Sequence, residues 1–153
     1  MEYDKYENVA NSDDFLEYEF ISKGIKGDIP KFIQYSPYKT QGVFNLALGT
    51  ILQNGNIDYK SKTNNGDMNK IIATTAATSY QFFKKYPNSA IFLTGDIPAK
   101  TRLYQMAINT AYDELAKDFR LWGLIFVRET QNYAQHPIEN GVNYDAFLIA
   151  MRK

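Results

Sequence analysis

The sequence predicts one α+β domain over residues 1–153, with a mainly antiparallel sheet and two helices packed on one face. Two observations lead to this fold class. Apolar residues alternate with a period of two in the first third of the chain, and a helical spacing of three and four then appears twice. A length of 153 residues fits one domain, and 44% hydrophobic and 15% aromatic residues can fill its core. The predicted order is ββββ-α-β-α-ββ.

The opening strands follow a polar lead-in, residues 1–14. Leu16, Tyr18 and Phe20 alternate with glutamates, which is typical of a half-buried strand. Residues 29–37 and 44–48 predict the second and third strands, and the turn 54–56 precedes a short strand at 57–59. These segments predict an antiparallel meander.

Two helices are expected to alternate with the remaining strands. The first begins at the N-cap Asp67 and ends before Pro87. The second has Pro98 near its first position and ends near Lys117. Their expected core-facing residues are Met68, Ile72, Ala76, Ser79, Phe83 and Tyr86 in the first helix, with Ile71 and Phe82 widening the stripe, and Leu103, Met106, Ala107, Thr110, Ala111 and Leu115 in the second. Strands are expected at 90–94, 121–128 and 144–151, with a loop at 131–143.

Charge and composition exclude several function classes. Seventeen basic and 17 acidic residues give zero net charge, so the chain lacks the long-range field of a general nucleic-acid binder. The absence of cysteine excludes disulfides, thiolate zinc sites and cysteine catalysis. The one histidine, His136, lies in the predicted loop, so no metal and no cofactor are expected. Residues 1–14 are not a signal peptide and no segment has the length of a membrane span, which predicts a soluble, cytoplasmic protein without a membrane partner.

The most informative segment is residues 95–102. It follows a predicted strand, begins with Gly95, and continues into a helix start that carries Lys100 and Arg102. Because a helix N-terminus is the positive end of the helix dipole, cations there are unfavourable unless something negative is bound. The segment predicts an anion-binding site formed by Lys100, Thr101 and Arg102. In the alternative interpretation, Asp96 caps the helix and Arg102 pairs with a carboxylate such as Asp67. The segment alone favours this alternative, because arginines bonded to protein groups outnumber ligand-binding arginines in most folds.

Two other segments carry candidate residues. Asp67 beside Lys70 is either an acid, base or metal ligand, or an N-cap after a flexible loop, and the sequence favours the cap. The glycine-rich basic segment 22–31 lacks the Gly-Lys-Ser/Thr ending of a phosphate-binding P-loop. A solvated tight turn is the favoured interpretation of that segment.

The chain also resembles a family of bacterial proteins known only as a domain of unknown function. The resemblance covers nearly the whole chain and rests on Phe20, Ser22, Gly24, Lys26, Gly27, Ile29 and Lys31; Asn45 and Gly49; Gly66, Asp67 and residues 70–74; Gly95 and residues 99–104; Gly123; and residues 144–153. In the family pattern an acid tends to occupy the position of Thr50, Ser-Thr that of Asp96-Ile97, and arginine that of Lys100. This chain therefore has no acid at 50 and no hydroxyl at 96 or 97 with which to fill such a role.

The function expected from these residues is binding or regulation without catalysis, at the anion site of Lys100, Thr101 and Arg102. Its supporting residues are Asp67, Lys70, Gly95, Asp96 and Tyr104. The expected partner is a nucleic acid, a phosphorylated ligand or a protein. One alternative is a phosphodiester or phosphate-ester hydrolase that brings Asp67 and Lys70 together with Lys100 and Arg102. Another is a protein-partner module such as a toxin–antitoxin component.

Overall fold

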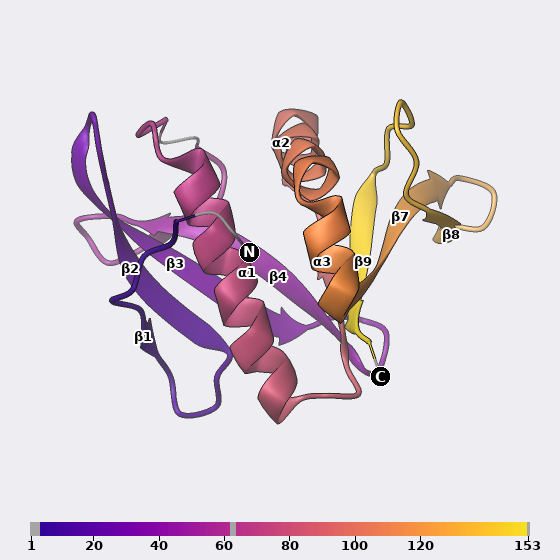
Figure 1. The fold of residues 1–153 in the computed structure, drawn as a ribbon, viewed down its shortest axis with the longest axis horizontal. Coiled ribbons are helices and arrows are strands. Elements are labelled where there is room, and N and C mark those ends of the chain that lie inside the picture. Colours follow the sequence, from indigo (N-terminus) through magenta and orange to yellow (C-terminus); the bar gives the residue numbers. More distant parts are fainter. Residues whose placement is uncertain (1–3, 62–63, 153) are drawn as a thin grey trace. The chain divides into compact units, whose positions relative to one another are not determined.

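The protein is described by a computed structural model that covers residues 4–61 and 64–152. The chain forms two compact units (Figure 1). Unit 1 comprises Met1–Ser36 and Ala47–Pro87, and unit 2 comprises Pro37–Leu46 and Asn88–Lys153. The strand β4 (Val43–Ile51) contributes to both units. The α+β class is confirmed, whereas the single domain stays a prediction.

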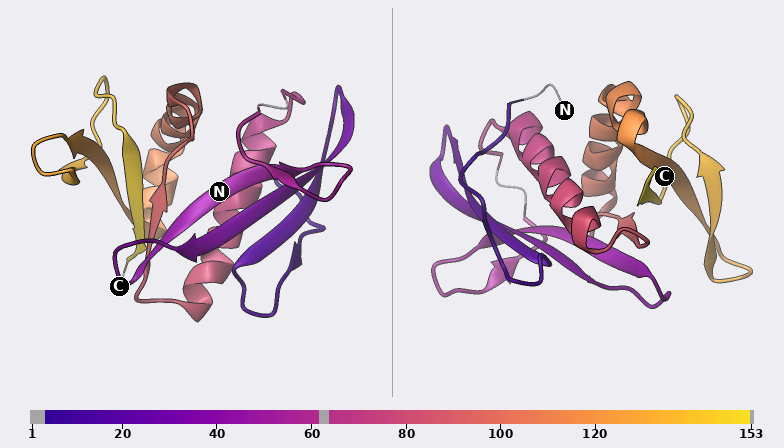
Figure 2. Two further views of the ribbon diagram at one scale, coloured as in Figure 1. Left: turned by 180° about the vertical axis from the view of Figure 1, so that it is seen from behind. Right: turned by 60° about the horizontal axis from the view of Figure 1, so that its bottom comes forward.

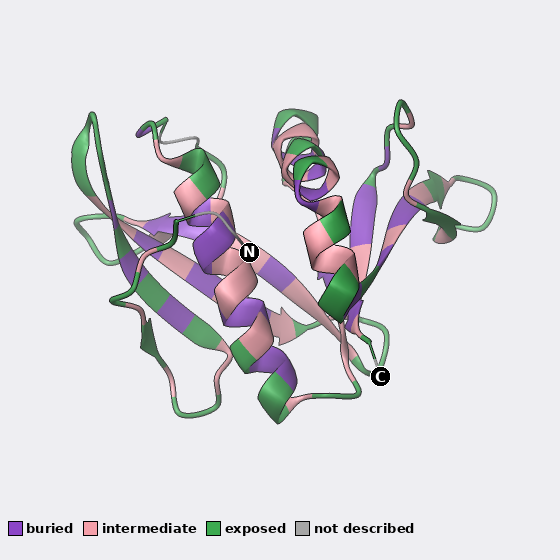
Figure 3. Ribbon diagram, in the orientation of Figure 1, coloured by how far each residue is buried: buried purple, intermediate pink, exposed green. Residues whose placement is uncertain are grey.

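Unit 1 is an antiparallel sheet with one helix on it. The strands are β1 (Ala10–Asn11), β2 (Glu17–Gly24), β3 (Gly27–Pro37), the later part of β4, and β5 (Ile57–Asp58). The β2–β3 register runs from Glu17 opposite Gln34 to Gly24 opposite Gly27. Buried and exposed residues alternate along β2, as the period of two predicts (Figure 3).

The helix α1 (Met68–Lys85) lies across the sheet of unit 1 (Figure 2). The ring of Tyr35 stacks on Phe82 with centroids 4.5 Å apart, and its hydroxyl lies 2.9 Å from the hydroxyls of both Thr78 and Ser79. The buried face is partly the expected one: Ile71, Ser79, Phe82 and Phe83 are buried as predicted, while Met68 is exposed. Hydropathy missed the buried Thr74 and Thr78, whose hydroxyls bond to carbonyls within the helix.

Unit 2 is a second set of paired strands. The early part of β4 pairs in parallel with β6 (Ala90–Leu93), and β9 (Ala146–Met151) is antiparallel both to β6 and to β7 (Phe119–Val127). The strand β8 (Asn132–Pro137) pairs with β7 only. It occupies part of the expected loop 131–143, and it was missed because most of its residues are polar and exposed.

The helices of unit 2 are α2 (Pro98–Thr110) and α3 (Tyr112–Asp118). The described residues thus hold three helices rather than two, because the predicted second helix is interrupted at Ala111. The core-facing residues predicted for α2 were partly wrong. Met106 is 64% exposed, and the buried positions of α2 are Lys100, Thr101, Gln105 and Ile108. None of the helices among residues 4–61 and 64–152 is long and apolar enough to cross a membrane.

Candidate functional site

A buried asparagine fixes the start of α1 to the β2–β3 hairpin. Asn65 is 2% exposed, and its side-chain amide donates to the Ser22 hydroxyl and to the Gly27 carbonyl, both at 3.0 Å. Its side-chain oxygen accepts the Lys26 N–H at 2.6 Å. A Cβ at Gly24 would lie 1.8 Å from the Asn65 carbonyl oxygen, so only glycine permits this approach. The loop predicted to be flexible is therefore anchored at Asn65.

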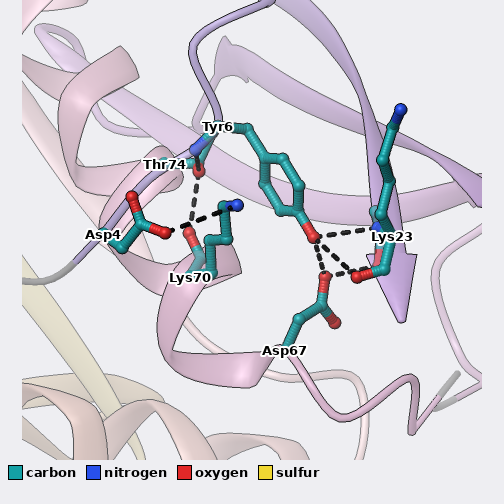
Figure 4. Close-up of polar contacts among 7 residues, drawn as sticks. Asp4, Tyr6, Lys23, Asp67, Lys70 and Thr74 are labelled. Carbon is teal, nitrogen blue, oxygen red and sulfur yellow. Dashed lines mark hydrogen bonds and ion pairs between the residues drawn. The ribbon is translucent and has the colours of Figure 1, made fainter. Parts of the chain in front are cut away.

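Asp67 lies at the N-cap of α1, as predicted, but its carboxylate makes no capping bond. Its Oδ2 instead accepts the Ser22 hydroxyl at 2.6 Å and the Tyr6 hydroxyl (Figure 4). Its Oδ1 is enclosed and has no hydrogen-bond partner. The pKa of Tyr6 is raised by burial and by its hydrogen bond to Asp67. Two segments that looked separate in sequence, the hairpin and the loop before α1, thus form one polar cluster.

Lys70 lies one turn further along α1, between two residues near the N-terminus. Its Nζ is 3.5 Å from Asp4 Oδ2 and 4.3 Å from the centroid of the Tyr6 ring. A surface pocket of about 710 Å³ opens here, lined by Asp4 and residues 64–71. Asn64 and Gly66, in the loop before α1, also line this pocket, and both have a positive φ. We call this the α1 pocket.

The start of α2 has a tightly packed arrangement. Ile97 is its N-cap and Pro98 its first residue, so Asp96 does not cap the helix. The hydroxyl of Thr101 accepts the Gly95 N–H at 3.0 Å, and a Cβ at Gly95 would lie 2.5 Å from the Lys100 Cβ. Lys100 and Thr101 are 7% and 4% exposed. Two of the three residues of the predicted anion site, Lys100 and Thr101, are therefore buried within unit 2.

Arg102, the third residue of the predicted anion site, bonds to protein groups. It donates to Gln105 Oε1 at 2.7 Å and to the Tyr144 carbonyl, so its partner is not Asp67. Gln105 also accepts the Tyr144 N–H at 3.1 Å and donates to the Val142 carbonyl at 2.7 Å. Together these bonds hold the segment before β9 on α2.

Tyr144 completes this cluster in unit 2. Its hydroxyl donates to the Pro137 carbonyl at 2.8 Å and accepts the Glu139 N–H at 2.9 Å. A Cβ at Gly123 would lie 2.3 Å from the Tyr144 ring, so the ring packs directly on the backbone of β7. Tyr104, a supporting residue in the prediction, has its pKa raised to about 12 by burial and, to a lesser extent, by Asp96.

Sequence reasoning found Asp67 and Lys70 but missed most of their partners. Tyr6 was part of the polar lead-in, and Asn65 part of a loop, because both are isolated residues in polar surroundings. Their partners in the hairpin and α1 lie 17 to 68 positions away in the sequence. His136 is exposed, as expected, but lies in β8 rather than in a loop. Among the described residues, no three His, Asp or Glu side chains gather as metal ligands do.

The fold and these clusters define an α+β protein with a polar pocket at one helix start and a closed polar network at another. The chain belongs to a family of unknown function (DUF6934), whose model matches residues 2–152. The predicted resemblance is thereby confirmed at the level of the family. No curated protein and no solved structure matches the chain.

Proposed function

We propose that the protein is a non-catalytic binding protein that takes a small molecule with a phosphate or carboxylate group in the α1 pocket. The observation that carries this proposal is the composition of the pocket wall. It joins the N-terminus of an 18-residue helix to the ammonium group of Lys70. The wall also holds two carboxylates: Asp4, which pairs with Lys70, and Asp67, which accepts bonds from Tyr6 and Ser22. A helix start offers unpaired N–H groups and the positive end of the dipole to an anion.

The main-chain bonds of α1 leave these donors to a ligand. The amide of Ile71 bonds to the Asp67 carbonyl at 3.0 Å, which closes the first turn. The N–H groups of the three preceding residues, 68–70, have no acceptor within the helix. All three residues line the α1 pocket. A bound oxyanion would complete their hydrogen bonds and face Lys70 at the same time.

The state of Asp67 favours binding over hydrolysis. A general base must present a free oxygen to the attacking water or to the substrate. Here Oδ2 accepts bonds from Tyr6 and Ser22, and Oδ1 is enclosed. The hydrolase alternative requires a rearrangement of this carboxylate, whereas anion binding leaves it in place.

The α1 pocket supports anion binding better than the start of α2. At α2 the hydroxyl of Thr101 and the guanidinium of Arg102 are already bonded to protein groups, and Lys100 is buried. At α1 the cation lies in the pocket wall, 35% exposed, and its carboxylate partner, Asp4, is 85% exposed. An anion site at Lys100, Thr101 and Arg102 stays a prediction, and the same experiment tests it.

The test is a titration with inorganic phosphate, pyrophosphate and a nucleoside monophosphate, followed by amide chemical shifts. We expect saturable shifts in residues 64–71. We also expect about tenfold weaker binding in Lys70→Gln, since a lost ion contact of about 1.4 kcal/mol is a factor of ten. Lys84→Gln, in the last turn of α1, is the matched control and should bind as the wild type does. Chemical-shift changes confined to residues 98–102 would place the anion site at the start of α2. The absence of any chemical-shift change would overturn the proposal.

A further inference from the structure

A short segment before β1 crosses the start of α1, and we call residues 4–9 the strap. It has neither helical nor strand structure, and the side chains of Lys5, Glu7 and Asn8 are exposed. Two of its side chains contact α1. Asp4 forms an ion pair with Lys70, and the Tyr6 hydroxyl bonds to Asp67 (Figure 4).

Tyr6 is the residue that anchors the strap. Its N–H donates to the Thr74 hydroxyl at 2.9 Å, and its hydroxyl accepts the Lys23 N–H at 2.8 Å. Its ring stacks on Phe20 with centroids 5.4 Å apart, and Lys70 lies over the ring. One half-buried tyrosine therefore connects α1, β2 and the strap.

The strap engages the same group that a bound anion would use. Among the residues that line the α1 pocket, Lys70 is the one cation, and Asp4 already places a carboxylate 3.5 Å from it. A phosphate in the pocket would compete with that carboxylate for one ammonium group, and the two negative charges would repel each other. Asp4 itself lines the pocket, so its departure also enlarges the space for a ligand.

We propose that the strap is an autoinhibitory element that closes over the α1 pocket and competes with the anionic ligand, an inference that rests on the proposed function. With the strap closed, Asp4 holds Lys70 and Tyr6 holds Asp67. With the strap released, the Lys70 ammonium group is free to meet a ligand, while the carboxylate of Asp67 stays bonded to the Ser22 hydroxyl. The apparent affinity then equals the intrinsic affinity multiplied by the fraction of molecules with an open strap. By linkage, a bound anion must raise the ratio of open to closed molecules by the factor with which opening tightens binding.

Two measurements on the full chain test the competition. Trypsin cleavage after Lys5, followed by mass spectrometry, reports the open fraction, because a protease requires a released segment. Titration with pyrophosphate reports the affinity. Asp4→Asn removes the ion pair, and Tyr6→Phe removes the hydroxyl bonds with no change of charge. Glu7→Gln is the matched control, because it removes a carboxylate from an exposed side chain of the same segment.

We expect Asp4→Asn and Tyr6→Phe each to raise the cleavage rate severalfold, and Asp4→Asn to tighten pyrophosphate binding by a similar factor, with Glu7→Gln unchanged. Saturating pyrophosphate should also accelerate cleavage of the wild type. Faster cleavage with unchanged affinity would overturn the inference and leave the proposed function standing. Cleavage that responds to the variants while no form binds an anion would overturn both. If Tyr6→Phe lowers the melting temperature, Asp4→Asn alone decides the outcome.

Discussion

Replacing Arg102 by alanine separates a structural role from an anion-binding role. The side chain holds two acceptors, Gln105 Oε1 and the Tyr144 carbonyl. A hydrogen bond from a charged donor contributes about 1.5–3 kcal/mol to stability. Because Arg102 is partly exposed, we take a value near the lower end of that range for each of its two bonds. We therefore expect Arg102→Ala to lower the free energy of unfolding by about 3 kcal/mol. For a chain of this size, that corresponds to a fall of about 6–12 °C in the melting temperature.

The assay is urea denaturation followed by far-ultraviolet circular dichroism, with Arg120→Ala as the matched control. Arg120 is exposed and lies over the Trp122 ring at 5.3 Å, so its removal should cost less than about 1 kcal/mol. An Arg102→Ala protein within about 0.5 kcal/mol of the wild type would refute the structural role, because that is the range of ordinary surface substitutions. Loss of anion binding in the same variant would then favour the site predicted at α2.

Three further predictions follow from buried contacts. Burial raises the pKa of Tyr35 to about 12, so the neutral phenol stabilises the fold below about pH 10. About 3 kcal/mol of that stability is lost as the pH rises through about 12, and Tyr35→Phe should flatten this alkaline fall in urea denaturation; an unchanged slope would contradict it. Gly123→Ala forces a Cβ into the Tyr144 ring and should cost at least about 1–3 kcal/mol, whereas a neutral effect on the melting temperature would show that the ring moves aside. Asn65→Ala removes the side-chain bonds to the Lys26 N–H, the Gly27 carbonyl and the Ser22 hydroxyl and should cost about 1–3 kcal/mol, with faster hydrogen exchange at Lys26; unchanged exchange there would count against the anchor.

The sequence predicts most where one physical signal dominates. In β2 and β3 the period of two is clear because one face is buried, and both strands lie where expected. In α2 the same reasoning chose Met106 for the core, while Gln105 is the buried residue. Gln105 is buried because three protein groups satisfy its amide, and hydropathy does not register such partners.

The candidate site was predicted in part for the same reason. Asp67 and Lys70 were recognised from their position at a helix start, which is a local signal. Tyr6 and Ser22, which bind the carboxylate of Asp67, lie 61 and 45 positions away from it. Only the folded chain brings them together.

The position of β9 constrains how unit 2 is made. This strand lies between β6 and β7, with Phe92 opposite Leu148 on one side and Trp122 opposite Leu148 on the other. While the chain is being synthesised, β6 and β7 are complete long before residues 146–151 exist, and their facing edges have no partner. Exposed edges of this kind pair readily with other chains. The sheet of unit 2 is therefore complete only when β9 pairs with both neighbours, and ending the chain before Ala146 would remove the middle of the sheet rather than its margin.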